Sequence, residues 1–137
     1  MKIVIDTNII ISALIKDGIA RRIIFSPFIQ FITPDHSLKE ISKYEKLICE
    51  KSKLNHYELK LLLNIIFEKI LIIPKEDYKD KLNIAKNMIK DVDDVTFIAL
   101  YLVSKADGIW SDDKDFKTSK NLLIFRTKEL ALIFKSK

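Results

Sequence analysis

Five short apolar runs alternate with longer segments of helical spacing, and this alternation constrains the fold more than any other feature of the chain. The runs are predicted strands, and they cover residues 2–6, 28–33, 70–73, 108–111 and 122–125. Strands that alternate with helices are typical of parallel sheets with helices on both faces. We therefore predict an α/β fold, a three-layer α/β/α sandwich with a central parallel sheet of four to five strands. Residues 1–137 are expected to form a single domain.

The segments between these runs carry helix signals. Helices are predicted over residues 8–15, 21–25, 55–69, 78–89 and 94–105, with a last one capped by Thr127. Thr33 and Pro34 have the pattern of an N-cap followed by proline in the first helical position, so a further helix is expected there. Its apolar positions follow at helical spacing, at Leu38, Ile41, Tyr44 and Ile48. Asn55 and Glu58 have the spacing of a capping box.

The charge balance permits nucleic-acid binding without requiring it. The chain has 24 basic and 19 acidic residues and a net charge of +5, which lysines on solvated faces explain equally well. Cys49 is the single cysteine, so an internal disulfide is excluded and a reducing compartment is expected. No apolar run is long enough to cross a membrane, and no signal peptide is recognised. A cytoplasmic protein with no membrane contact is expected.

Acidic residues follow the predicted strands at the points where a site would lie. Asp6 ends the first apolar run, and Glu40 lies in the helix expected after the second run. Two further groups, at the start of the 94–105 helix and after the fourth run, are Asp91, Asp93 and Asp94, and Asp112, Asp113 and Asp115. Ligands in open α/β sheets bind at the carboxyl ends of the strands, so we expect these acids to lie near one another.

Each acid has an ordinary explanation when taken alone, as a turn residue, a helix cap or a surface charge. Together they indicate a cation site. Two carboxylates about 4 Å apart repel by about 4 kcal/mol at an effective dielectric constant near 20. Their convergence therefore requires raised pKa values or a divalent ion. Oxygen ligands favour Mg²⁺ or Mn²⁺, whereas one cysteine and two distant histidines make zinc a poor fit.

Four segments spread over nearly the whole chain carry a family resemblance. They read IVIDTN at residues 3–8, SLKEI at 37–41, DVDDVTFIALYL at 91–102 and ADGIWSDDKDF at 106–116. In this order they resemble the PIN domain family of metal-dependent ribonucleases. A haloacid-dehalogenase-type phosphatase fits less well, because Asn8 stands where it needs a second Asp. A response-regulator receiver needs an acidic pair near the end of the first strand, where this chain has only Asp6.

The resemblance implies roles for individual residues. The acids that match the catalytic positions of the family are Asp6, Glu40, Asp94, Asp113 and Asp115. Of these, Asp6, Asp94 and Asp113 would hold the metal, directly or through water, and the other two would complete the site or orient water. The supporting polar positions are Thr7, Asn8 and Ser111. A shift of one residue in the comparison would exchange Asp94 for Asp93 and Asp113 for Asp112.

The function implied by the resemblance is hydrolysis of RNA phosphodiester bonds with Mg²⁺ or Mn²⁺, as the toxin of a toxin–antitoxin system. Its partners would be an RNA substrate, an antitoxin protein and a second copy of the chain in a homodimer. The alternative is an RNA-binding or RNA-processing module with little catalytic activity. No histidine is expected in position to act as a general base. Basic residues expected at the rim are Lys16, Arg21, Arg22, Lys114 and Lys117.

Overall fold

A central sheet of five parallel strands organises the structure, a computed structural model that describes residues 1–114, 116 and 122–135. The strands are β1 (Lys2–Ile5), β2 (Gln30–Pro34), β3 (Ile70–Ile73), β4 (Gly108–Trp110) and β5 (Ile124–Phe125). Their order across the sheet is β3-β2-β1-β4-β5, and each neighbouring pair is parallel. The predicted α/β class and parallel sheet are therefore confirmed.

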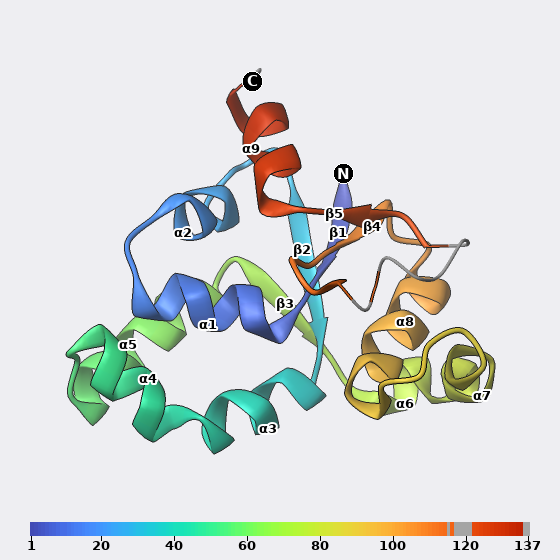
Figure 1. The fold of residues 1–137 in the computed structure, drawn as a ribbon, viewed down its shortest axis with the longest axis horizontal. Coiled ribbons are helices and arrows are strands. Elements are labelled where there is room, and N and C mark those ends of the chain that lie inside the picture. Colours follow the sequence, from blue (N-terminus) through green and yellow to red (C-terminus); the bar gives the residue numbers. More distant parts are fainter. Residues whose placement is uncertain (115, 117–121, 136–137) are drawn as a thin grey trace.

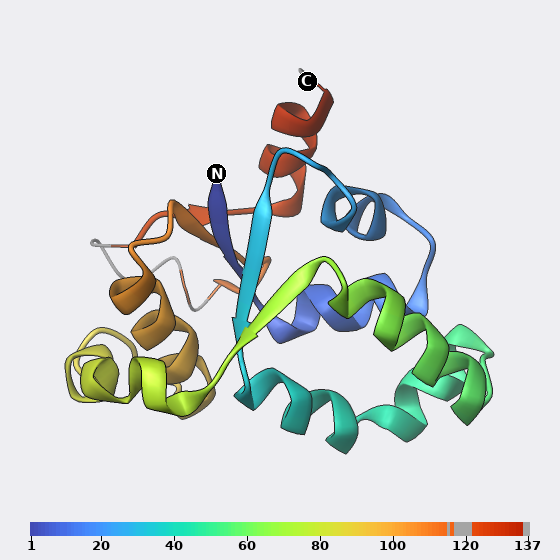
Figure 2. The same ribbon diagram turned by 180° about the vertical axis from the view of Figure 1, so that it is seen from behind.

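Helices cover both faces of the sheet (Figures 1 and 2). One group consists of α1 (Thr7–Ile15), α2 (Ile19–Ile24), α3 (His36–Lys43), α4 (Glu45–Ser52), α5 (His56–Phe67) and α9 (Thr127–Lys135). The other consists of α6 (Lys75–Tyr78), the short 3-10 turn η1 (Lys79–Lys81), α7 (Leu82–Lys86) and α8 (Val92–Ser104). Alternate residues of β1 enter separate hydrophobic clusters, Ile3 and Ile5 in one and Val4 in the other, because successive strand side chains point to opposite faces.

The helix predicted to start at Thr33 and Pro34 begins later, so that prediction is wrong. Both residues belong to β2, where Pro34 is the last residue and pairs with Ile73. Helix α3 starts at His36, and the expected continuous helix is divided at Tyr44, with α4 following. The divided helix leaves Leu38 and Tyr44 exposed, whereas Ile41 and Ile48 are buried as expected.

Other helix boundaries also differ from the predictions. The single helix expected over residues 78–89 is divided into α6, η1 and α7. Helix α8 begins at Val92, because the Asp91 carboxylate accepts the Asp93 N–H at 3.0 Å and caps the first turn. The capping box at Asn55 and Glu58 is confirmed. No helix in the described ranges has the length and apolar character needed to cross a membrane.

Two acids cap helices that begin far from them in the sequence. The Asp35 carboxylate accepts the Lys75 N–H at 3.1 Å and the Tyr78 hydroxyl at 2.5 Å, which joins the end of β2 to α6. The Asp112 carboxylate accepts the backbone N–H of Thr127 at 2.9 Å and its hydroxyl at 2.7 Å. Thr127 is thus the first residue of α9 and does not act as its cap. Asp112 supplies the carboxylate that the orphan N–H groups of this helix need.

We expect Gly108→Ala to destabilise the fold by about 1–3 kcal/mol, the usual cost of overpacking a filled interior. A Cβ at Gly108 would lie 2.5 Å from Cε2 of Phe125, 2.7 Å from its Cδ2 and 3.0 Å from the Leu123 carbonyl oxygen. The added methyl group would therefore push β5 away from β4. Urea unfolding measures the effect, with Gly18→Ala as the control, because the nearest atoms to a Cβ there are 3.7 Å away. Equal stability of the two variants would contradict this packing.

Candidate functional site

Asp6 is a buried carboxylate at the carboxyl end of β1, with 4% of its surface exposed. Its Oδ2 accepts the Ser111 hydroxyl at 2.8 Å, and it also accepts the backbone N–H of Asn8. Its own N–H donates to the Trp110 carbonyl at 3.0 Å. Because β4 is the neighbour of β1, the residues that follow the two strands meet here. The Asn8 side chain is exposed, so its backbone is the part that contacts Asp6.

The surroundings of Asp6 disfavour its charged form. Burial is the largest cause, and it raises the pKa of the Asp6 carboxyl from an ordinary value of 3.8 to about 6. The negative charges of Glu40 and Asp113 raise this pKa further, while the hydrogen bonds from Ser111 and Asn8 oppose the increase. Three of the predicted site acids therefore interact electrostatically, and a cation among them would relieve their repulsion.

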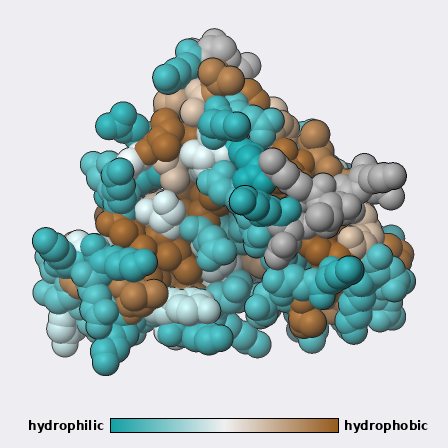
Figure 3. Space-filling view, in the orientation of Figure 1, coloured by the Kyte–Doolittle hydropathy of each residue, from teal (hydrophilic) through white to brown (hydrophobic). Residues whose placement is uncertain are grey.

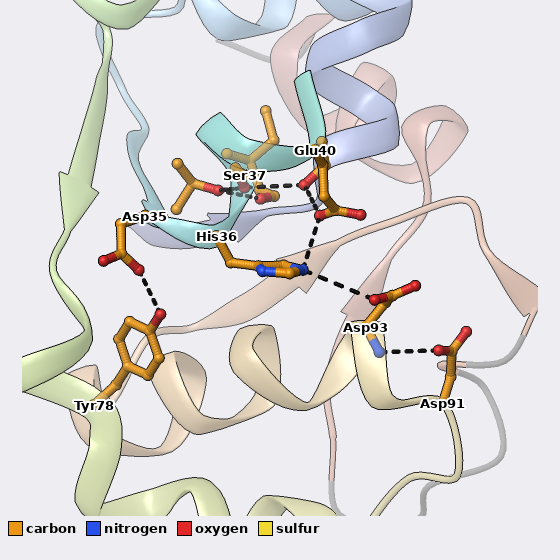
Figure 4. A network of polar contacts seen from close by, with 10 residues as sticks. Asp35, His36, Ser37, Glu40, Tyr78, Asp91 and Asp93 are labelled. Carbon is orange, nitrogen blue, oxygen red and sulfur yellow. Dashed lines mark hydrogen bonds and ion pairs between the residues drawn. The ribbon is translucent and has the colours of Figure 1, made fainter. Parts of the chain in front are cut away.

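Glu40 is held by a chain of buried hydroxyl groups. The Thr7 hydroxyl donates to Glu40 Oε1 at 2.7 Å. The Thr7 and Ser37 oxygens are 3.0 Å apart, and those of Ser37 and Thr33 are 2.7 Å apart. The chain ends where the Thr33 hydroxyl donates to the Ile5 carbonyl at 3.0 Å. Thr33 lies in β2, Ser37 in α3 and Thr7 in α1, so the chain fixes the Glu40 carboxylate relative to β1. Figure 4 shows Ser37 and Glu40 in this network.

Ser37 and Thr33 are not among the residues predicted for the site. Ser37 precedes Glu40 by three residues, so the two share one face of α3. Thr33 precedes Ser37 by four residues and lies in the buried part of β2. Both side chains are completely buried, and a buried hydroxyl needs a hydrogen-bond partner. The spacing of Ser37 and Glu40 is visible in the sequence, whereas Thr33 has the local pattern of a helix cap, which conceals its contact with Ser37.

The two acids at the start of α8 differ in environment. Asp94 is buried, with 6% of its surface exposed, whereas 71% of the Asp93 side chain is exposed. Adjacent helical residues point in directions about 100° apart, so only one of them can face the sheet. The structure directs Asp94 inward and leaves Asp93 at the surface beside α3.

The two described acids after β4 also differ in environment, since one contacts α9 and the other lies near Asp6. Asp112 points to α9, as described above. Asp113 donates its backbone N–H to the Ser111 hydroxyl at 3.0 Å, and its charge raises the pKa of Asp6. Ser111 thereby connects Asp6 with Asp113. Asp115 lies outside the described residues, and so does Lys117 among the predicted basic residues.

One histidine, His36, lies beside two of the acids, a contact that was not predicted from the sequence. Nε2 of His36 is 3.7 Å from Glu40 Oε1 and 3.9 Å from Asp93 Oδ1. His36 is the first residue of α3, and it precedes Glu40 by one helical turn. The sequence signal is the spacing of four between His36 and Glu40, which is clear only once the start of α3 is known.

The basic residues predicted for the rim lie in different environments. Lys16 lines a pocket of about 180 Å³ together with Ser12, Asp112 and Thr127. Arg22 and Lys114 are exposed. Arg21 instead donates from Nε to the carbonyl of residue 13 at 2.8 Å and from Nη2 to that of residue 14 at 3.5 Å. It thus satisfies carbonyl groups near the end of α1.

The donor chemistry suits a hard divalent cation. The buried Asp6 carboxylate and the nearby charges of Glu40 and Asp113 supply oxygen ligands and an excess of negative charge. Among residues 1–114, 116 and 122–135, no three His, Cys, Asp or Glu side chains form a group able to hold a metal ion as they stand. A bound cation would therefore have to draw the acids closer together.

Comparisons with known proteins identify the family and the fold of the chain. A family model described as PIN domain matches residues 4–130, which confirms the resemblance seen in the sequence. Among solved structures, the fold is similar to the crystal structure of VapBC2 from Rickettsia felis bound to a DNA fragment from their promoter. The TM-score is 0.64 at 18% identity, with 92% of this chain and 98% of that chain covered. A search of curated proteins found no significant match.

Proposed function

The chain belongs to the PIN domain family, and from this premise we propose that it is an endoribonuclease that hydrolyses RNA phosphodiester bonds with Mg²⁺ or Mn²⁺. The observation that carries the proposal is the buried Asp6 carboxylate, whose pKa is raised to about 6 by burial and by the charges of Glu40 and Asp113. Such an arrangement costs stability when no cation is bound, and a cation bound among these acids would relieve that cost.

In the proposed site, Asp6, Asp94 and Asp113 would hold the metal, directly or through water. When bound, the ion lowers the pKa of an attacking water and stabilises charge on the leaving oxygen. The hydroxyl of Ser111 and the N–H of Asn8 keep the Asp6 carboxylate in one orientation. Hydrogen bonds of this kind, made to a ligand from behind, are what give a metal ligand a fixed direction.

Glu40 would orient water or complete the metal site, and Asp115 is proposed for the same task. The Thr7 hydroxyl occupies one side of Oε1 of Glu40 at 2.7 Å, so the carboxylate has a fixed edge from which to accept a proton or hold a water. Lys16, which lines the pocket of about 180 Å³ beside α9, and Lys114 are proposed to contact the RNA backbone. Each phosphate contact of this kind would make RNA binding more sensitive to salt.

We further propose a toxin role, with an antitoxin protein as partner and a homodimer as assembly. The family membership and the likeness of the fold to VapBC2 support this role. A groove between α1 and α5 suits a protein partner, because apolar side chains line much of it, together with the charged Asp17, Arg21 and Glu58. Its apolar residues include Leu14, Ile15, Leu61, Leu62 and Ile65. Figure 3 shows hydrophobic residues over α1 on this face. Growth arrest on expression, relieved by Asp94→Asn, would support the toxin role.

The second candidate function is an RNA-binding or RNA-processing module with little catalytic activity. One observation favours it, namely that the side chains in the described part of the chain do not by themselves form a three-ligand metal group. Under this alternative the acids would tune RNA binding or an assembly contact, and cleavage would be negligible with any divalent ion.

Single-turnover cleavage of a mixed RNA pool distinguishes the two functions. We expect cleavage with Mg²⁺ or Mn²⁺, its loss in EDTA, and a decrease of about a hundredfold or more for Asp94→Asn, since an ion supplies several kcal/mol of transition-state stabilisation. Asp80→Asn is the matched control, because Asp80 is an exposed acid in η1 and is not among the acids of the proposed site.

Cleavage that survives both EDTA and Asp94→Asn would contradict the metal mechanism. RNA binding without cleavage under every condition would favour the alternative function.

A further inference from the structure

His36 occupies a position that the proposed mechanism does not yet use. Its Nε2 atom is buried and has no hydrogen-bond partner, although 29% of the side chain as a whole is exposed. The atom lies 3.7 Å from Glu40 Oε1 on α3 and 3.9 Å from Asp93 Oδ1 on α8. Figure 4 shows the imidazole ring between the two carboxylates.

The ring is held in this place by packing. Its edge-to-face contact with Phe97 has a centroid distance of 6.5 Å and an interplanar angle of 77°, and Phe97 is itself buried in α8. Polar atoms that are buried without a partner are uncommon and costly, so each one calls for a physical reason. Here Nε2 is within about 1 Å of hydrogen-bonding distance to two carboxylates at once. Contacts at functional sites are often long without ligand and shorten when the ligand binds.

His36 connects two parts of the polar network. On one side, Glu40 Oε1 is bonded to Thr7 and hence to the hydroxyl chain that ends at β1. On the other side, Asp93 belongs to the first turn of α8, where its N–H is bonded to Asp91. In this network His36 links α3 with α8, and the next residue of that turn is the buried Asp94.

We propose that His36 is a positioning residue that sets the spacing between Glu40 on α3 and the first turn of α8, which carries Asp94. This inference rests on the proposed function, because the spacing matters only if acids of both helices serve one metal site. The imidazole contacts neither substrate nor the reacting atoms in this role. It acts by holding Glu40 and Asp93 from between, so that the two helices stay at a separation from which a cation can draw their acids together.

The test compares two amides at position 36 in the full chain. His36→Gln can place its amide nitrogen near the position of Nε2, whereas His36→Asn is too short to do so, and both are uncharged. The readout is the affinity for Mn²⁺ alone, measured by calorimetry or by the signal of free Mn²⁺, with the fold checked by circular dichroism. We expect His36→Asn to weaken Mn²⁺ binding about tenfold, the usual effect of losing a residue that orients a metal ligand, and His36→Gln to stay near the wild type.

Two comparisons make the test specific. His56→Asn is the matched control, because Nδ1 of His56 contacts Glu45 at 3.0 Å in a similar pair on α5 and α4. The double variant, His36→Asn with Asp93→Asn, should bind Mn²⁺ no more weakly than the single variant with the lower Mn²⁺ affinity, because both changes break the same link.

Unchanged Mn²⁺ affinity of His36→Asn in a wild-type background that binds Mn²⁺ and cleaves RNA would overturn this inference alone. Equal weakening by His36→Asn and His36→Gln would also overturn it, since the reach of the side chain would then not matter. A wild-type chain that fails to bind Mn²⁺ would overturn the proposed function and this inference together.

Discussion

Replacing Asp6 with asparagine should stabilise the fold at pH 7 and abolish RNA cleavage. The Asp6 carboxyl has a pKa of about 6, above its ordinary 3.8, because burial and the charges of Glu40 and Asp113 disfavour the ionised form. At pH 7 the carboxyl is ionised in the folded wild type, which therefore carries the full cost of a buried charge. The difference between the pKa values of 3.8 and about 6 corresponds to about 3 kcal/mol of lost stability. The asparagine side chain would be neutral at every pH, and its single carbonyl oxygen would still accept one of the two hydrogen bonds that Ser111 and Asn8 donate to the carboxylate. Cleavage should decrease about a thousandfold, because the metal would lose its buried ligand.

The free energy of unfolding of the wild type should depend on pH through the Asp6 carboxyl. Between pH 3.8 and about 6 the folded chain binds more protons at Asp6 than the unfolded chain does. The free energy of unfolding therefore falls as the pH rises through this window, by the amount that linkage requires. Below the window both states are protonated and the cost disappears. We expect the stability advantage of Asp6→Asn to be largest at pH 7 and to vanish below about pH 3.8, the lower end of the window, as measured by urea unfolding in EDTA.

A divalent ion should favour the stability of the wild type over that of Asp6→Asn. Mn²⁺ binds the ionised carboxylate, so it should raise the melting temperature of the wild type and leave that of Asp6→Asn nearly unchanged. Glu50→Gln, at an exposed position of α4, is the control for loss of a negative charge. An Asp6→Asn variant that is less stable than the wild type at pH 7 would show that burial does not penalise the carboxylate as inferred.

The sheet and the position of Asp6 were predictable because strong local signals determine them. Short β-branched runs bounded by turn residues predict strands, and an acid that ends such a run must lie at the carboxyl edge. The contact of Ser111 with Asp6 also follows once β1 and β4 are neighbours, because each residue comes directly after its strand. Neighbouring strands of a parallel sheet can thus bring together residues that are far apart in the chain.

The remaining features depend on tertiary contacts that no local pattern encodes. Asp35 and Asp112 cap helices that lie far from them in sequence, and so the caps predicted from local spacing at Thr33 and Thr127 are wrong. His36 was overlooked for a related reason. Its neighbour on α8, Asp93, is brought to it only by the packing of α8 against the sheet, which periodicity within α3 does not reveal.

Replacing Asp112 should lower the stability of the fold, whereas replacing Asp113 should lower the rate of RNA cleavage. Asp112→Ala removes the carboxylate that accepts both the N–H and the hydroxyl of Thr127, so it should cost about 1–2 kcal/mol of stability, as the loss of a helix cap does. Asp113→Asn removes a charge that raises the pKa of Asp6. It should leave stability equal or slightly higher and reduce metal-dependent cleavage about a hundredfold, as for the loss of a metal ligand. Urea unfolding and single-turnover cleavage of both variants provide the two measurements.

The two variants decide a choice that the sequence left open, because a shift of one residue exchanges these two acids. Asp112 is bound to the start of α9 by two hydrogen bonds, and an acid committed there is not available to a cation beside Asp6. Asp113 has its backbone fixed by Ser111, the residue that also fixes Asp6. Loss of cleavage in Asp112→Ala with full activity of Asp113→Asn would reverse these roles. Loss of cleavage in both variants at unchanged stability would mean that the whole loop, rather than one carboxylate, forms the site.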